Sequence, residues 1–197
     1  MPEFRIMALA TFVKISSVNN LSDARYCAGM EVDQLGFIIE EGQEGAISAE
    51  DFKEITDWLS GVEFIGELST IATTLAQYKI DGIQIQSADQ VEAALATGLN
   101  VVYTTDTTAD ANQVLTNFPK LSYVLLENDS IEELKQLDNP EQVVITNGFN
   151  ADNVKSIVEE HNLKGIAMKG GDEIRPGYKN FDELADILEA LDTDEYV

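Results

Sequence analysis

The sequence is short of cysteine and of basic side chains. Cys27 is its only cysteine, which excludes an internal disulfide and a zinc site built from cysteines. No apolar run approaches the roughly 18 residues that a membrane helix needs. Residues 1–12 hold one arginine and no small-residue cleavage site, so we expect no signal peptide and a cytoplasmic protein.

Twelve basic residues stand against 36 acidic ones, which gives a formal net charge of −24. So acidic a surface repels phosphate backbones and anionic lipids, and we expect neither a nucleic acid nor a membrane as partner. An anionic small molecule would need a local concentration of positive charge. Solubility or adaptation to salt explains the acidity as well as a partner does.

Short apolar runs alternate along the chain with polar–apolar patterns of helical period. Eight runs are typical of strands: Thr11–Ser16, Gln34–Ile39, Glu63–Leu68, Gly82–Gln86, Asn100–Thr104, Ser122–Glu127, Gln142–Thr146 and Gly165–Met168. Helices are expected near 21–29, 48–60, 70–78, 88–97, 109–117, 130–137, 151–160 and 180–191. We expect the fifth helix to be the least regular.

Repeated strand–helix units imply right-handed crossovers and a parallel sheet. Eight units in 197 residues leave roughly 25 residues each, which suits a small closed barrel with short loops. We therefore predict an α/β protein made of one domain, residues 1–197, folded as a (β/α)8 TIM barrel. The barrel covers about 11–191, and an acidic C-terminal tail follows at about 192–197. The short loops leave no room for a cofactor-binding insertion, and we expect neither a cofactor nor a metal.

The chemistry of such barrels lies at the carboxyl ends of the strands. Alternation along each strand sorts inward from outward side chains. Lys14 and Ser16 should point inward from the first strand, and Gln84 and Gln86 from the fourth. Glu127 should place a carboxylate at the barrel mouth, across from Ser16.

Two glycine-containing turns indicate an anion site. They follow the seventh and eighth strands and comprise Asn147, Gly148, Phe149 and Asn150, and Lys169, Gly170, Gly171 and Asp172. Glycines let backbone amides approach an anion, and barrels often bind phosphate at these two loops. Lys169, Arg175 and Lys179 concentrate positive charge there, and Lys14 on the neighbouring first strand would add to it. The alternative is a pair of ordinary turns with surface lysines.

Five stretches in the same order resemble the phosphoribosylanthranilate isomerase family, barrel enzymes of tryptophan biosynthesis. K-I-S-S-V-N-N-L-S-D-A at 14–24 resembles the family's K-I-C-G-I-T-N-L-x-D-A. A-G-M-E-V-D-Q-L-G-F-I at 28–38 is similar to A-G-A-D-x-L-G-F-I. G-I-Q-I-Q at 82–86 resembles x-V-Q-L-H, and N-G-F-N-A-D-N-V at 147–154 resembles G-G-L-N-P-E-N-V. P-G-Y-K at 176–179 resembles P-G-x-K.

The resemblance implies an Amadori rearrangement, in which an acid protonates the ribose ring oxygen and a cysteine thiolate removes the C2 proton. Ser16 stands at the cysteine position, Glu127 at the acid's position and Gln86 at a histidine position. An unassisted serine hydroxyl is a poor base at neutral pH. The only histidine, His161, is expected at the end of an outer helix. Residues 43–47 lack the arginine that would bind the anthranilate carboxylate.

Three hypotheses follow. The first is a barrel without isomerase activity that binds a phosphorylated small molecule or a partner protein. The second is an active isomerase that uses Glu127, and the third is another phosphosugar reaction involving Glu127, Lys14 or Lys169. Lys14 could form a Schiff base if its pKa fell, but we favour a pairing with Glu127 or another inward acid. Monomer and homodimer remain open.

Overall fold

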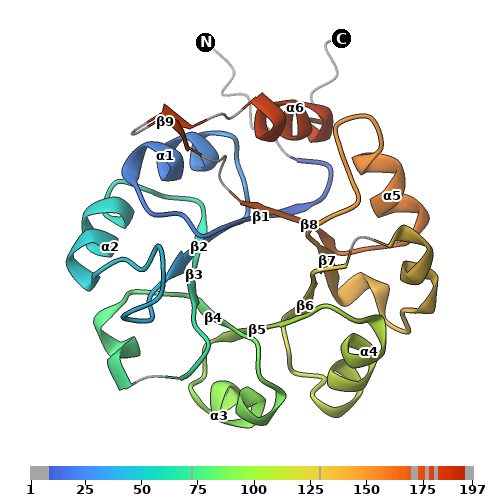
Figure 1. Ribbon diagram of the computed structural model, residues 1–197, viewed down its shortest axis with the longest axis horizontal. Helices are drawn as coiled ribbons and strands as arrows, with labels where there is room; N and C mark the ends of the chain where they lie inside the picture. Colours follow the sequence, from blue (N-terminus) through green and yellow to red (C-terminus); the bar gives the residue numbers. More distant parts are fainter. Residues whose placement is uncertain are drawn as a thin grey trace, which may run out of the picture.

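The protein is a closed barrel of eight parallel strands in sequence order, as predicted (Figure 1). The computed structural model describes residues 9–71, 73–128, 130–169, 173–175, 178–179 and 182–193. Strand β1 pairs with both β2 and β8, which closes the barrel. The strands are β1 Phe12–Ser16, β2 Gln34–Ile38, β3 Glu63–Glu67, β4 Gly82–Ile85, β5 Asn100–Thr105, β6 Tyr123–Leu126, β7 Val143–Ile145 and β8 Gly165–Lys169.

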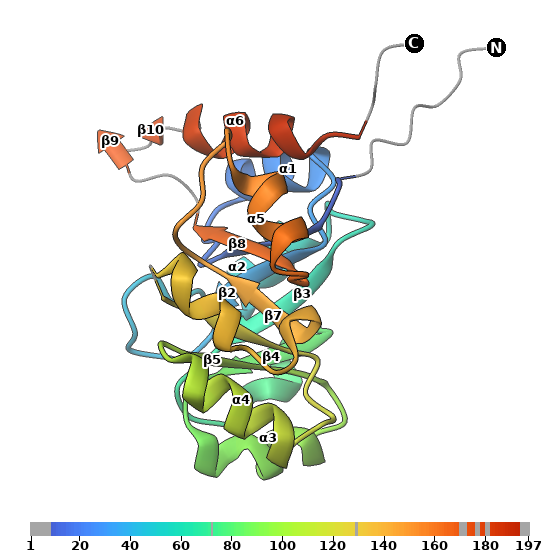
Figure 2. The ribbon, with the colours of Figure 1, turned by 90° about the vertical axis from the view of Figure 1, so that its right-hand side faces the viewer.

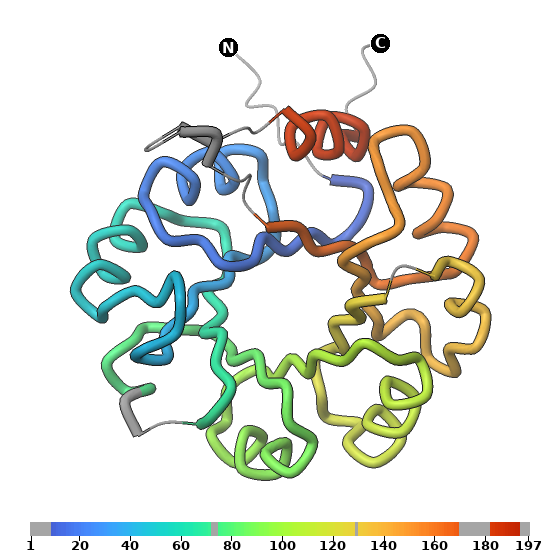
Figure 3. Tube along the Cα trace, viewed as in Figure 1, coloured from blue at the N-terminus to red at the C-terminus, as the bar shows by residue number. Residues whose placement is uncertain are grey.

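Helical segments form a ring around the barrel (Figures 1 and 3). The α-helices are α1 Leu21–Gly29, α2 Ala49–Thr56, α3 Val91–Ala96, α4 Thr108–Asn117, α5 Val154–Glu160 and α6 Asp182–Leu191. Short 3-10 segments are η1 Thr73–Gln77, η2 Ala88–Gln90, η3 Ile131–Gln136 and η4 Pro140–Gln142. Ser48 begins α2 as a capping residue, since its Oγ accepts a 3.1 Å hydrogen bond from the Asp51 amide.

The least regular helical connections are not the one that the sequence predicted. The third and sixth are the 3-10 segments η1 and η3, whereas the fifth, α4, is a ten-residue α-helix. Thr107 caps α4 through the Asp110 amide, but Ser130 makes no side-chain cap to η3. A segment of six residues forms few backbone hydrogen bonds, and η3 also lacks a capping side chain. It therefore gains little free energy to offset the free-energy cost of nucleating an α-helix.

A short antiparallel hairpin, β9 Glu173–Arg175 and β10 Tyr178–Lys179, was not predicted. It lies outside the ring, beside the start of α6 (Figure 2).

The barrel interior is mostly polar on one side and mostly apolar on the other, although Thr104 of β5 is also a buried polar residue. Strands β1–β4 contribute buried polar side chains, namely Lys14, Ser16, Gln34, Glu67 and Gln84. Strands β5–β8 contribute a separate cluster of Val102, Tyr123, Leu125, Val144 and Ala167. The outward residues Val13 and Ile15 belong to the main core between the barrel and the helices, as alternation predicted. Polar interior groups therefore gather under one half of the mouth.

Candidate functional site

The carboxyl ends of the strands surround a cavity of about 600 Å³, which we call the mouth cavity. Ser16, Gln84, Gln86 and Glu127 all line it, so the structure brings these sequence-selected residues together. The remaining lining residues include Ser17, Gln43, Glu67, Ser69, Thr146, Asn147 and Lys169. Each comes from a strand end or the loop after it, where a (β/α)8 barrel places its chemistry.

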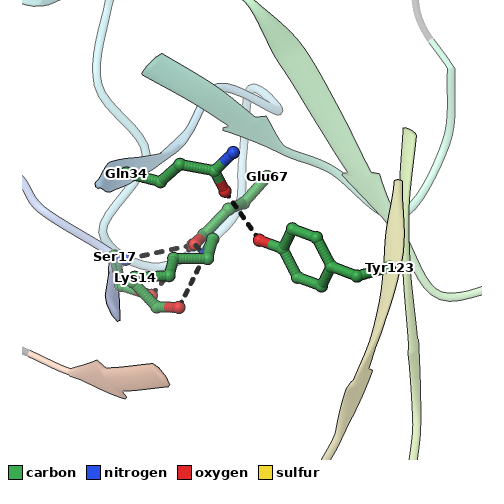
Figure 4. A network of polar contacts seen from close by, with 6 residues as sticks. Lys14, Ser17, Gln34, Glu67 and Tyr123 are labelled. Atoms are coloured by element: carbon green, nitrogen blue, oxygen red, sulfur yellow. Dashed lines mark hydrogen bonds and ion pairs between the residues drawn. The ribbon is translucent and has the colours of Figure 1, made fainter. Parts of the chain in front are cut away.

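A buried ion pair lies beneath this cavity (Figure 4). The Lys14 side chain is fully buried, and its Nζ lies 2.5 Å from Oε1 of Glu67. Lys14 Nζ also donates a 2.7 Å hydrogen bond to Oγ of Ser16. The sequence analysis favoured an inward acid as the partner of Lys14, and Glu67 on β3 is that acid. Lys14 therefore adds no free positive charge to the anion site, contrary to expectation.

Neighbouring residues hold Glu67 in place. The backbone amide and Oγ of Ser17 both donate to Glu67 Oε2 at 3.1 Å. Ser17 has a φ of 58°, in the left-handed region that favours glycine. Gly36 on β2 leaves the room that the pair needs, because an added Cβ would lie 1.9 Å from Glu67 Oε1. The ion pair thus depends on the left-handed backbone of Ser17 and on the absence of a side chain at Gly36.

A second hydrogen-bond chain crosses the barrel at the level of Gln34 (Figure 4). The hydroxyl of Tyr123 donates to Gln34 Oε1 at 2.7 Å, and Gln34 Nε2 donates to Glu63 Oε2 at 2.7 Å. Burial raises the pKa of Tyr123 well above its ordinary value, so the phenol stays protonated and acts as a donor. These contacts pair the polar groups of Tyr123, Gln34 and Glu63 inside the barrel.

Ser16 has no general base beside it in the described part of the chain. The side-chain partner recorded for its Oγ is the Lys14 ammonium, which donates rather than accepts. His161 lies at the C-terminal end of α5, in the outer layer, as expected. Glu127 is exposed and lines the cavity with Ser16.

The loop after β7 and the end of β8 line a smaller cavity of about 270 Å³ beside the mouth. Asn147, Gly148, Phe149 and Lys169 line it, together with Glu183 and the apolar face of α6. Gly148 has a φ of 84°, in the left-handed region that favours glycine. Among the described residues, no acceptor is recorded for the amides of Gly148 and Phe149.

Asn150 has a different role from the one expected. Its amide donates to Asn153 Oδ1 at 2.7 Å, and its own Oδ1 accepts from the amides of Asp152 and Asn153. These bonds form a turn, and α5 begins only at Val154. The Asn150 amide is therefore committed within the loop. Gly170, Gly171 and Asp172 lie outside the described residues, as do the side chains of Arg175 and Lys179.

One cluster at the rim was missed by the sequence analysis. Glu40 Oε2 accepts from the Ser69 amide at 2.5 Å, from Ser69 Oγ at 2.7 Å and from Gln43 Nε2 at 2.7 Å. These hydrogen bonds, that of Ser69 Oγ first, lower the pKa of Glu40 and keep it ionised. The contacts between Glu40 and Ser69 join residues 29 positions apart, which no local pattern could reveal.

Ser69→Ala is expected to raise the pKa of Glu40, though not fully to its usual value because the backbone amide remains. A carboxylate whose folded-state pKa is lowered contributes stability above its unfolded pKa and loses it as the pH falls through the folded pKa. The stability advantage of the wild type over Ser69→Ala should therefore shrink as pH falls from about 5 to about 3. Carboxyl 13C NMR and urea unfolding at both pH values measure this. Ser156→Ala, on α5, should leave Glu40 unchanged.

The described ranges contain no group of three or more His, Cys, Asp or Glu side chains placed to hold a metal ion. Within the same ranges, no helix is long and apolar enough to span a membrane.

Fold and site together define a (β/α)8 barrel whose candidate ligand cavity lies at the carboxyl ends of its strands. Residues 13–190 match the model of the N-(5'-phosphoribosyl)anthranilate (PRA) isomerase family, so the chain belongs to that family. The N-(5'-phosphoribosyl)anthranilate isomerase of Aquifex aeolicus is 24% identical over 195 residues, which cover 89% of this chain and 96% of that protein.

Solved structures show the same fold at lower identity. The phosphoribosyl anthranilate isomerase of Thermotoga maritima superposes with a TM-score of 0.74 at 19% identity, over 92% of this chain and 98% of that one. The enzyme of Thermus thermophilus gives 0.74 at 19% identity, over 91% and 98%. These structures confirm the TIM barrel that the sequence indicated, and the match to the family model confirms the family.

Proposed function

We propose that this chain binds a phosphorylated small molecule at the loops after β7 and β8, and that it is not an efficient PRA isomerase. The observation that carries the proposal is the meeting of Asn147, Gly148, Phe149 and Lys169 at one cavity beside the mouth. Two backbone amides and an ammonium are the donors that a phosphate needs. A similar structure, of a PRA isomerase, contains reduced 1-(o-carboxyphenylamino)-1-deoxyribulose 5-phosphate.

The second half of the proposal rests on Ser16. The resemblance places it where the family's base stands, but its Oγ accepts a hydrogen bond from a charged lysine. Proton removal by a serine needs a basic partner, and Glu67 is already bonded to Lys14 and Ser17. The hydrogen bonds around Ser16 therefore support the proposal that it does not take the C2 proton as the family's cysteine does.

An active isomerase that uses Glu127 is the second candidate. Glu127 is exposed within the same cavity as Ser16, so one carboxyl group could donate a proton and later accept one. A Schiff base on Lys14 has no such support, because that side chain is fully buried and paired with Glu67.

Titration of the 15N-labelled protein with inorganic phosphate tests the binding site. We expect the amide signals of Gly148 and Phe149 to shift, and the affinity to fall with added salt because salt screens the attraction between the anion and Lys169. Lys169→Met should weaken binding by about 10-fold or more, the equivalent of one charge-assisted hydrogen bond. Lys120→Met removes the same charge from an exposed residue before β6 and is the matched control. Saturable shifts confined to other loops would contradict the proposal.

A further inference from the structure

The loop after β7 contains the only Asn–Gly pair of the sequence, Asn147–Gly148. Asparagine is one of the thermally labile residues of proteins. It deamidates when the backbone nitrogen of the next residue attacks the carbonyl carbon of its side chain. Glycine permits this attack most readily, because it has no Cβ and its backbone approaches other groups closely. The pair therefore has the sequence that a spontaneous covalent change requires.

The structure leaves both reacting groups of this pair accessible. Asn147 and Gly148 are exposed, and Asn147 lines both the mouth cavity and the smaller cavity beside it. The side-chain hydrogen bonds recorded in this loop belong to Thr146, Asn150 and Asn153, not to Asn147. Among the described residues, no acceptor is recorded for the Gly148 amide either. No recorded hydrogen bond has to break before the Gly148 nitrogen can reach the Asn147 side chain.

Two other exposed asparagines, Asn117 and Asn162, are held differently. The amide that follows Asn117 donates to the Val114 carbonyl at 2.8 Å, and the amide that follows Asn162 donates to the Val158 carbonyl at 2.9 Å. Each of these nitrogens is fixed by its hydrogen bond and belongs to a residue with a bulky side chain. Asn117 and Asn162 therefore share the exposure of Asn147 but not its free neighbouring amide.

We propose that Asn147 deamidates in the folded protein and that this modification weakens phosphate binding. The Gly148 nitrogen loses its proton and bonds to Cγ of Asn147, while the bond from Cγ to Nδ2 breaks and ammonia leaves with that proton. Water then opens the succinimide ring at either of its carbonyl groups, which gives aspartate or isoaspartate at position 147. Overall one water is consumed and one ammonia is released, and no oxidant or cofactor takes part.

The effect on binding rests on the proposed phosphate site. Either product adds a carboxylate to the cavity where Gly148, Phe149 and Lys169 meet, and its negative charge repels the anion. Isoaspartate also carries the backbone through the former side chain, which adds a methylene group before Gly148 and displaces both amides. Conversely, a bound phosphate would accept the hydrogen of the Gly148 amide and hold the nitrogen that must attack. Phosphate binding and deamidation should therefore exclude each other.

Incubation of the folded protein at mildly alkaline pH, followed by peptide mass spectrometry, tests the modification. We expect the peptide with Asn147 to gain the mass difference between OH and NH2 before the peptides with Asn117 and Asn162 do. The same chain unfolded in urea gives the reference rate for an unprotected site. Asn147→Gln should show no conversion at this position, because the attack would have to close a larger ring. An Asn147 that stays intact in the folded protein after the unfolded chain has converted would overturn the proposal.

Inorganic phosphate should protect Asn147. At about ten times its Kd, phosphate should slow the conversion about 10-fold, because only the unbound protein reacts. In Lys169→Met, with an affinity about 10-fold lower, the same concentration should slow the conversion only about 2-fold. The comparison also reveals any direct effect of phosphate on the reaction, since that effect would be equal in the two proteins.

Asn147→Asp reproduces one product and tests its effect on binding. The added charge should lower the affinity for inorganic phosphate by about 10-fold or more. Asn117→Asp adds the same charge at the exposed end of α4 and is the matched control, which should bind phosphate as the wild type does.

The outcomes separate this inference from the proposal on which its consequence rests. If Asn147 converts but inorganic phosphate neither binds nor protects it, the phosphate site is wrong and the modification stands. If phosphate shifts the Gly148 amide signal but Asn147 stays intact in the folded protein, the deamidation alone is overturned. Phosphate binding by Asn147→Asp as tight as that of the wild type would overturn the link between the two.

Discussion

Gly36→Ala is expected to destabilise the protein by about 3 kcal/mol or more, although it adds only one methyl group. The new Cβ would lie 1.9 Å from Oε1 of Glu67 and 2.7 Å from Nζ of Lys14. Both atoms belong to an ion pair in which the Lys14 side chain is fully buried and the Glu67 side chain is only 10% exposed, so making room for the methyl group pulls the pair apart. Displacing one partner leaves a buried charge uncompensated, which costs far more than the pair itself contributes. Urea unfolding measures the loss.

Gly29→Ala is the matched control. Gly29 ends α1 with no atom within 4 Å of its added Cβ, so alanine there should be neutral or stabilise by up to about 1 kcal/mol. A Gly36→Ala protein as stable as the wild type would mean that Glu67 does not occupy the space beside position 36. The description of the barrel interior would then be wrong.

Isomerase activity on phosphoribosylanthranilate is expected to be absent or far below that of the Aquifex aeolicus relative assayed in parallel. Loss of a well-placed general base typically costs 10² to 10⁴ in rate, roughly 3 to 5 kcal/mol. Without an arginine for the substrate carboxylate, a further charge-assisted bond of about 1.5–3 kcal/mol is missing. The two losses act on different parts of the substrate and should compound to about 10³-fold or more in kcat/KM.

Restoring both groups tests the explanation. Gly45 has a φ of 80°, so an arginine there would be strained, whereas Gln43 lines the mouth cavity and accepts one more readily. Ser16→Cys with Gln43→Arg should raise kcat/KM above that of either single variant. Growth of a tryptophan auxotroph lacking this isomerase on the wild-type chain at ordinary expression would contradict the negative expectation. Glu127→Gln would then be the first variant to assay.

The fold was predictable because its signals are local and repeated. All eight strands lie within one or two residues of the predicted runs, since alternating or apolar runs between polar segments carry their own register. Alternation also placed Gln84, Gln86 and Glu127 at the mouth. Helix regularity was less predictable, because 3-10 and α geometry in segments as short as η3 differ by a few tenths of a kcal/mol per residue.

The side-chain contacts that define the candidate site could not be predicted from the sequence. Glu67 lies 53 positions from Lys14, and in the sequence nothing distinguishes it from 35 other acids. The commitment of the Asn150 amide to Asn153 depends on a turn that delays α5 by three residues relative to the predicted start. Ser17 did carry a signal, since the family motif has glycine where its φ is 58°. The motif's glycine indicated the backbone conformation at position 17. It gave no indication that Ser17 would hold Glu67 in its ion pair with Lys14.

A crystal structure of the protein grown with inorganic phosphate tests the central claim most directly. We expect a tetrahedral density within about 2.7–3.2 Å of the amides of Gly148 and Phe149 and close to Nζ of Lys169. Bound phosphate there would establish the anchor on which the proposed function depends. Phosphate located only elsewhere, or the cavity beside α6 filled by Asp172 or the Glu183 carboxylate, would contradict it.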